Sequence, residues 1–306
     1  MHNSRPKPTA RPEWFNAMSP FARPHLGKGV WQLSVTFGGY LALWALMIYT
    51  VHQGYSYAVT LGLAVIAGAF LVRIFIFFHD ACHSSFFASR KANNILGYVA
   101  GILTFTPFLD WQRSHLKHHG SAGDLDNRGH GDVWTMTVDE YLNASWSRRL
   151  AYRLFRNPFV LLGLGPAYLF LISQRFPHKE AGYKERMNVL YTNAALLLIV
   201  GIAGLTMGLE TYLKIQLPVL IFAATMGVWL FYVQHQFRGV YWARHEDRDR
   251  LKWPCRAVPI TNCPGFCNGS PAISGCTTSI TCTPRSLITT CNPATTVFSP
   301  CKRFRH

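Results

Sequence analysis

Long apolar stretches alternate with polar segments along the chain. Four of these stretches are about twenty residues long, and they form an early pair and a late pair: 30–50 and 57–78, then 188–209 and 212–233. An α-helix rises about 1.5 Å per residue, so about twenty residues cross the hydrocarbon core of a bilayer, which is about 30 Å thick. The pattern therefore predicts four membrane-spanning helices, arranged as two pairs that are each joined by a tight turn.

Two further apolar blocks, 95–109 and 158–173, are shorter. Their length is typical of interfacial or re-entrant helical segments, and we do not expect them to cross the membrane. Composition agrees with a membrane protein, because 49% of the residues are hydrophobic and only 14% are charged, whereas soluble domains carry about a quarter charged residues. The prediction is an all-α integral membrane protein.

The basic residues divide unevenly between the two sides of the predicted membrane. The net charge is +16, yet the turns 51–56 and 210–211 contain no Lys or Arg, while 1–29 contains five and 110–187 contains eleven. Cytoplasmic loops carry such an excess, so we expect both termini on the cytoplasmic side of the membrane. Residues 1–29 lack the apolar segment of a signal peptide and are predicted to be a basic, proline-rich tail. A nucleic-acid partner is excluded, because the aromatic residues lie in or beside the spans and do not interleave with a basic stripe.

Six of the thirteen histidines stand beside the apolar blocks at spacings that suit metal binding. The motif "HDACH" places His79 and His83 one helical turn apart, directly after the second predicted span. The motif "RSHLKHHGSAGD" supplies three more, which we expect to converge on one helix, and "FYVQHQF" supplies one at the end of the last span: His115, His118, His119 and His235. The other seven match no such spacing and are predicted to be solvent or interface residues: His2, His25, His52, His130, His178, His245 and His306.

A shared metal centre requires all six histidines on one side of the membrane. This holds if the four long blocks cross and the two short ones do not, which predicts four transmembrane helices, two interfacial or re-entrant segments and a cytoplasmic histidine-rich cap. Imidazole binds iron, zinc and copper, and one zinc needs only three or four ligands, so six candidates favour two metal ions. Oxygen activation at a di-iron pair, followed by hydrogen abstraction from a lipid chain, is the chemistry that we infer.

Two neighbours of the histidines are candidates to orient the imidazole rings. Asp80 follows His79, and Gln234 precedes His235. Hydrogen bonds from such neighbours commonly fix the rings of metal-binding histidines. For Asp80 an equal alternative is that it caps or solvates a helix end.

At these motifs the chain resembles the membrane fatty acid desaturases, most closely the bacterial branch similar to omega-6 (delta-12) acyl-lipid enzymes. The matching text is "RIFIFFHDACHSSFF", "LTFTPFLDWQRSHLKHHGSAGDLDNRGHGDVWTMTVDEYL" and "FYVQHQFRGVYWARHED", within roughly 30–250. The resemblance implies four spans, two histidine-bound irons, O2 as co-substrate, a lipid-linked acyl substrate, and electrons from a ferredoxin or b-type cytochrome. It also implies that the six histidines named above are iron ligands.

The chain departs from this family after the last span. The family carries a third histidine box, HxxHH, in that region, but here only His245 and His306 follow residue 235. Seven of the eight cysteines instead lie after residue 254, with no CxxC pair that would indicate a zinc module. A disulfide framework is also unexpected, because the tail should face the reducing cytoplasm. The composition of the tail is that of an unstructured segment.

A slipped reading frame near Lys252 accounts for this tail. In the shifted frame, the last base of each codon joins the first two bases of the next codon. Read in this way from Trp253 onward, the gene can encode the amino-acid sequence "ALQGSSYYKLPRVLQWFTGNIGLHHIHHL", which contains the third histidine box of the family. A histidine in the shifted frame requires Ile, Met or Thr as the next residue in the present frame, and four such residues stand at the required positions: Thr277, Thr278, Ile280 and Thr281. We therefore predict a desaturase domain over 30–252 and an out-of-frame, unstructured tail over 253–306. The alternative is a tail that has diverged.

The predicted function is desaturation of a lipid-linked acyl chain, impaired in the chain as written. Two alternatives stay open. One is an alkane or carotenoid hydroxylase or ketolase of the same superfamily, and the other is a membrane metal-binding protein without catalytic activity.

Overall fold

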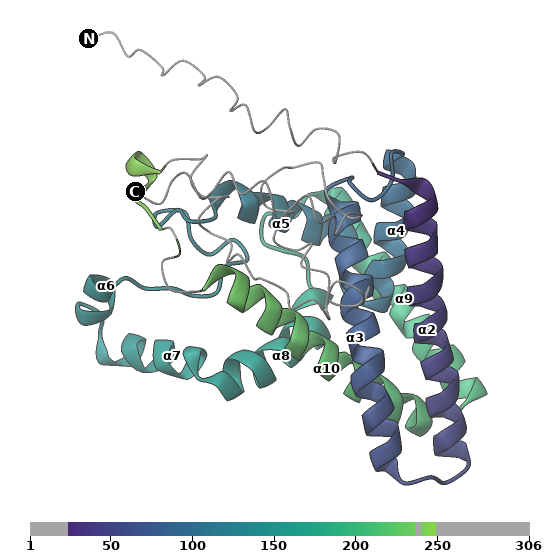
Figure 1. Cartoon of the computed structure of the whole chain (residues 1–306). Coiled ribbons are helices and arrows are strands. Elements are labelled where there is room, and N and C mark those ends of the chain that lie inside the picture. The colour runs from purple at the N-terminus through teal and green to yellow at the C-terminus, as the bar shows by residue number, and fades with distance from the viewer. Residues whose placement is uncertain (1–23, 237–239, 241, 249–306) are drawn as a thin grey trace, which may run out of the picture.

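The computed structural model describes residues 24–236, 240 and 242–248, and these residues are almost entirely helical (Figure 1). Four helices are long and apolar enough to cross a membrane: α2 (Leu26–His52), α3 (Tyr57–Cys82), α9 (Tyr183–Thr206) and α10 (Leu209–His235). They confirm the four predicted spans. The predicted tail 1–29 and the predicted tail 253–306 lie wholly or mostly outside the described residues, although α2 already begins at Leu26.

The two tight turns between the paired helices each use a glycine in the left-handed region. Gly54 has φ +70° between α2 and α3, and Gly208 has φ +86° between α9 and α10. Only glycine adopts this conformation without strain. These turns reverse the chain at one end of each helix pair. The first lies within the predicted turn 51–56, whereas the second lies at 207–208, and the predicted turn 210–211 belongs to α10.

Helix α3 forms the centre of the apolar core, and α2 and α10 pack against it (Figure 1). Its buried face includes Leu71, Ile74 and Phe78, and it meets the buried Ile215 and Val219 of α10. Gly68 permits this close approach, because a Cβ at that position would lie 3.3 Å from the Val219 carbonyl oxygen. The approach of α3 and α10 brings their C-terminal ends toward the same side of the molecule.

The two shorter apolar blocks form bent pairs of helices. Helices α4 (Arg90–Leu103) and α5 (Phe108–Ser121) meet at 102°, and α7 (Trp146–Arg156) meets the segment Val160–Arg175 at 64°. That last segment comprises the π-helix η2 (Val160–Leu164), α8 (Gly165–Leu171) and the 3-10 turn η3 (Ser173–Arg175). Bends of this size occur in re-entrant loops and also in broken spans that cross the membrane, so the expectation that the two blocks do not cross stays a prediction.

The remaining described elements are short. Helix α6 (Val138–Leu142) precedes α7, and the 3-10 turn η4 (His245–Asp247) follows α10. The described part of the chain contains no β-strand, and one isolated bridge joins Asp124 to Ala243. That bridge ties the chain after α10 to the loop after α5.

Candidate metal centre

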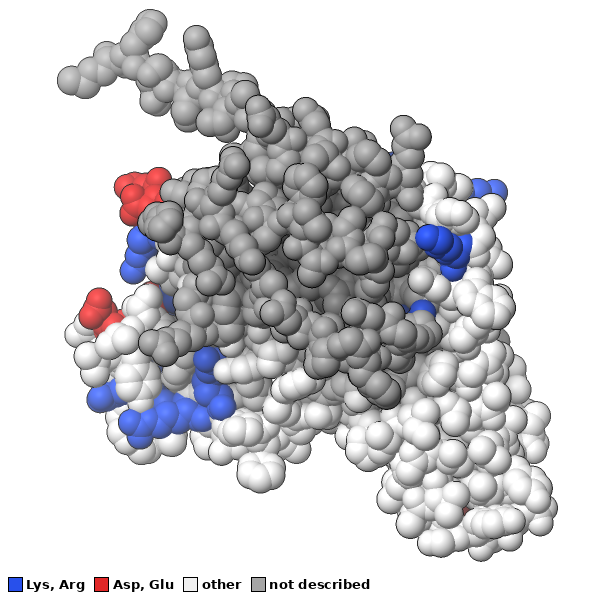
Figure 2. All heavy atoms as spheres, viewed as in Figure 1, with Lys and Arg blue, Asp and Glu red and all other residues white. Residues whose placement is uncertain are grey.

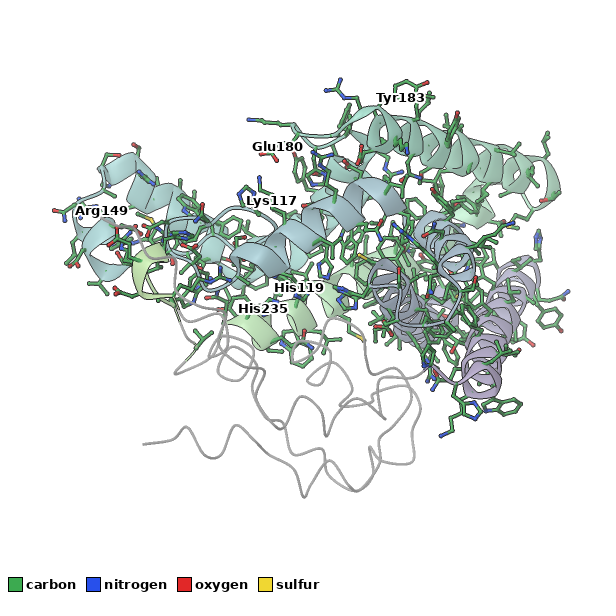
Figure 3. All side chains as sticks on the ribbon, turned by 90° about the horizontal axis from the view of Figure 1, so that it is seen from above. Lys117, His119, Arg149, Glu180, Tyr183 and His235 are labelled. Carbon is green, nitrogen blue, oxygen red and sulfur yellow. The ribbon has the colours of Figure 1, made fainter. Side chains whose placement is uncertain are left out.

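Helix α5 carries three of the candidate histidines past the ends of α3 and α10. Figure 3 looks onto this side of the molecule, with Lys117 and His119 on α5 and His235 at the end of α10. Helix α3 contributes His79 from its last turn and His83 from the residue that follows the helix. The fold thus brings together six residues that lie in three separate parts of the sequence.

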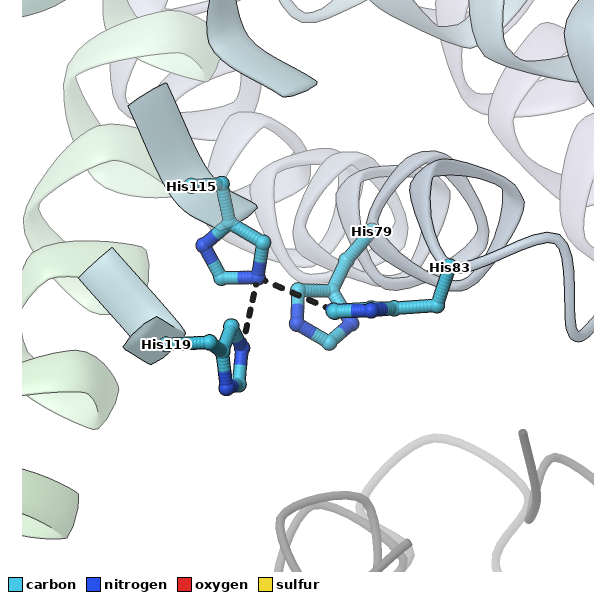
Figure 4. Close-up of side chains that lie close together, drawn as sticks. All are labelled: His79, His83, His115 and His119. Carbon is cyan, nitrogen blue, oxygen red and sulfur yellow. Dashed lines mark hydrogen bonds between the residues drawn. The ribbon is translucent and has the colours of Figure 1, made fainter. Parts of the chain in front are cut away.

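Four of the histidines form one cluster (Figure 4). The cluster consists of His79, His83, His115 and His119, and one ring nitrogen from each lies within 4.8 Å of the others. Nε2 of His115 lies 3.1 Å from Nε2 of His83 and 2.9 Å from Nε2 of His119. Four half-buried imidazoles with converging nitrogens are a donor set that suits one transition-metal ion.

His118 and His235 form a second group. Their Nε2 atoms lie 3.4 Å apart, and the ring of His118 is almost fully buried. On the other edge of that ring, Oδ1 of Asp132 lies 2.9 Å from Nδ1 of His118. This contact is an ion pair without hydrogen-bond geometry, and the opposite ring nitrogen, Nε2, is the one that faces His235.

Only two of the three histidines of α5 that the spacing allowed to converge join the group of four. Residues 115 and 119 lie about 40° apart around a helix, whereas 118 and 119 lie about 100° apart. His115 and His119 therefore face α3, and His118 faces α10. Helical geometry divides the six histidines into a group of four and a group of two.

Burial and crowding lower the pKa of three imidazoles of the group of four that lie outside the spans. Burial, with a smaller contribution from His79, lowers the pKa of His83 to about 3. Burial and the neighbouring imidazoles lower the pKa of His119 to about 2 and that of His115 well below its usual value. Neutral imidazole is the form that binds a metal, so these nitrogens are free to donate at neutral pH. The residues present fit a bound metal ion.

Aromatic rings support the group of four. Trp111 stacks on His115, with ring centroids 4.2 Å apart and planes 14° apart. Phe78 lies against Trp111 at 4.9 Å, and Phe75 lies at 5.5 Å. These contacts restrict the rotation of His115 and place an apolar surface directly beside the cluster.

The two candidate orienting residues have different surroundings. Asp80 is buried, and its Oδ1 lies 3.3 Å from Nδ1 of His79, so it stands where an orienting carboxylate would stand. Gln234 lies half-buried in the last turn of α10. The orienting roles of both residues stay predictions.

Sequence reasoning missed three aspartates beside histidines. Asp132 contacts His118, as described above. The other two are buried and pair with histidines that we expected to be mere solvent or interface residues: Nδ1 of His178 lies 2.6 Å from Asp110, and Nδ1 of His245 lies 2.7 Å from Asp124. The side chains of His178 and His245 are exposed to solvent, but each ring is paired with one of these buried aspartates. For Asp124 and Asp132 the sequence did carry a signal, namely the acidic run "GDLDNRGHGD" directly after the histidine motif. Acidic side chains in such a place commonly bond to nearby imidazoles.

The family model described as "Fatty acid desaturase" matches residues 55–263. The chain belongs to the fatty acid desaturase family. The matched residues contain both histidine groups and the helices that carry them. The family and the clustered imidazoles together indicate a metal site.

Curated relatives of this chain include bacterial and plant proteins. A "Fatty acid desaturase" of Bacillus subtilis (strain 168) is 46% identical over 227 residues, which is 74% of this chain and 64% of that protein. An "sn-1 acyl-lipid omega-3 desaturase (ferredoxin)" of Nostoc sp. (strain 36) is 26% identical over 60% of this chain and 52% of that protein. A chloroplastic "Omega-3 fatty acid desaturase" of Glycine max is 29% identical over 61% of this chain and 40% of that protein. The chain thus spans less than two thirds of the length of these relatives.

Proposed function

We propose that this protein introduces a double bond into a lipid-linked acyl chain, using O2 at a di-iron centre held by the six histidines. The observation that carries the proposal is the division of these histidines into a group of four and a group of two at the ends of membrane-crossing helices. Two groups on one helix suit two neighbouring metal ions. The names of the relatives support an acyl-lipid substrate.

The reaction balances with one O2 and an external electron donor. Two hydrogen atoms leave adjacent methylene groups, and together with two electrons and two protons they reduce O2 to two molecules of water. Iron, when bound, supplies the oxygen activation that no side chain can supply. A b-type cytochrome and a ferredoxin are both possible donors, and the name of the Nostoc relative favours ferredoxin.

The residues of the chain bind and orient the reactants. The imidazoles would hold the metal, and Trp111 and Phe75, packed against the fully buried Phe78, present an apolar surface beside the group of four. An acyl chain that lies along the helices reaches this surface without entering water. Apolar walls also exclude water from the reacting carbon atoms.

The proposed orientation places the histidines and both termini on the cytoplasmic side of a bacterial membrane. Basic residues support it, because they gather beside the helices on the histidine-bearing side and are absent from the short turns. Figure 2 shows one gathering over the region of α7, whose basic residues are Arg148, Arg149, Arg153 and Arg156. A soluble electron donor would reach the metal centre from that compartment.

We also propose that the chain as written is impaired, because its reading frame has slipped near Lys252. The family model supports this, since its match ends at residue 263 and leaves 264–306 unmatched. The group of four histidines lies before the slip. The group of two would lack the ligands that the shifted frame supplies.

Product analysis with the frame-corrected chain tests the proposed function. Membranes that contain the corrected protein receive reduced ferredoxin and O2, and their fatty acids are then analysed by mass spectrometry. We expect fatty acids that are two mass units lighter, with no added oxygen atom. Hydroxylated products would instead assign the protein to the hydroxylases, and metal binding without any product would assign it to the non-catalytic metal-binding proteins.

A further inference from the structure

The chain that follows α10 turns back and attaches to the end of α5. We call residues 243–248 the return segment. The Leu125 amide donates to the Ala243 carbonyl oxygen at 2.9 Å, and the Ala243 amide donates to the Gly123 carbonyl oxygen at 3.0 Å. This pair of hydrogen bonds aligns the return segment with the loop that leaves α5.

Two aspartates of that loop hold the return segment through side chains. Asp124 is only 1% exposed and accepts from Nδ1 of His245 at 2.7 Å. Asp126 accepts from the His245 amide at 2.8 Å and from Arg244 at 2.6 Å. His245 is therefore bonded through both its backbone and its ring.

Arg248 reaches the end of the helix itself. Its guanidinium donates to the Gly120 carbonyl oxygen at 2.8 Å and to the Ala122 carbonyl oxygen at 3.0 Å. The last carbonyl groups of a helix have no partner within the helix, and a cation beside them also interacts favourably with the helix dipole. Arg248 thus stabilises the C-terminal end of α5.

The last turn of α5 contains His118 and His119, one from each histidine group. Terminal turns fray, because they make fewer backbone hydrogen bonds than the middle of a helix. The other end of α5 is fixed separately, since Asn188 accepts from the Leu109 amide at 2.9 Å and Asp110 pairs with His178. Without the return segment, the turn that carries these two histidines would be the loosely held end.

We propose that the return segment positions His118 and His119 by fixing the last turn of α5, with His245 and Arg248 as positioning residues. The inference rests on the proposed metal-binding role of the histidines. His245 and Arg248 lie before the predicted frame slip, so the chain as written keeps both. The return segment therefore holds His119 of the group of four even where the second group lacks its further ligands.

The test uses the full chain as written, purified in detergent, with Co²⁺ as the probe. The visible absorption of bound Co²⁺ reports its coordination geometry. We expect Arg248→Gln to weaken Co²⁺ binding about 10-fold or more and to change the absorption spectrum, as loss of a group that orients metal ligands does. Because an arginine is not a metal ligand, this effect can come only through the position of α5. His52→Gln, at the exposed end of α2, is the matched control and should behave as the parent.

Three further measurements separate the outcomes. Arg248→Lys, which keeps a cation near the carbonyls, should restore part of the affinity, and hydrogen exchange of the amides at 118–122 should accelerate in Arg248→Gln. His245→Gln should act in the same direction as Arg248→Gln.

Parental Co²⁺ affinity, spectrum and exchange in Arg248→Gln would overturn the positioning role while leaving the proposed function intact. Failure of the parent itself to bind Co²⁺ would instead refute the metal centre. If Arg248→Gln does not fold, His245→Gln decides, since parental Co²⁺ affinity, spectrum and amide exchange in that variant would overturn the proposal.

Discussion

His118 and His235 face each other across the space between α5 and α10, with their Nε2 atoms 3.4 Å apart. One residue further along α5, His119 points about 100° away around the helix and joins His79, His83 and His115. A single helix therefore contributes to both histidine groups. The metal content of the protein should follow this division.

The first prediction concerns metal stoichiometry in the chain as written. We expect about one iron per chain, because four imidazoles form one donor set and the second group has only two. His83→Gln should lose most of this iron, whereas His235→Gln should retain it. Elemental analysis of the purified proteins measures the ratio. Equal losses in the two variants would contradict the division into two groups.

The second prediction concerns the ring that stacks on His115. Trp111→Leu should weaken metal binding about 10-fold, since the residue that orients a metal ligand is lost. Trp111→Phe keeps an aromatic face and should lose less. An equilibrium titration with Co²⁺ compares the two variants. If the leucine and phenylalanine variants bind equally well, ring stacking contributes nothing to the site.

The third prediction concerns pH and the Asp110–His178 pair. The hydrogen bond with Asp110 raises the pKa of His178 above its ordinary value, against the opposing effect of burial. A group with a raised pKa in the folded state stabilises the fold fully below its unfolded value of about 6.5, and that contribution disappears as the pH rises through the folded pKa.

The thermal midpoint of the parent should therefore exceed that of His178→Gln more at pH 6 than at pH 9. Thermal unfolding in detergent at the two pH values measures this difference. His52→Gln again serves as the control. If the gap between the thermal midpoints of the parent and His178→Gln is instead larger at pH 9 than at pH 6, the fold holds His178 in its neutral form and the prediction is wrong.

The fourth prediction concerns the sharp bend between α4 and α5. A Cβ on Gly101 would lie 2.5 Å from the Thr106 carbonyl oxygen, so Gly101→Ala must shift backbone. We expect a destabilisation of about 1–3 kcal/mol, as overpacking generally costs. Gly201→Ala is the control, because a Cβ there meets nothing within 4 Å. Thermal unfolding of both variants measures the effect, and equal stability would mean that the bend is not tightly packed.

Local patterns in the sequence were sufficient to predict the spans and the candidate ligands. Apolar length fixes whether a helix can cross the membrane, so the ranges 57–78 and 212–233 lie inside α3 and α10. Helical spacing likewise identified His79 and His83. Both signals lie within one continuous stretch of chain and need no knowledge of the fold.

The missed features depend on contacts between distant parts of the chain. Asp124 and His245 are 121 positions apart, and Asp110 and His178 are 68 positions apart. No spacing rule covers such separations, so these histidines looked like solvent residues. The assignment of His118 to a different group from His119 also needed the position of α10.

The most direct test of the whole account compares two forms of the gene in one bacterial host that lacks the corresponding unsaturated fatty acid. One form encodes the chain as written, and the other restores the shifted frame from about residue 253. Gas chromatography with mass spectrometry of the membrane lipids is the measurement. We predict a new double bond only in cells that express the corrected form. New unsaturation from the chain as written, or none from a corrected form that is present in the membrane, would contradict the account.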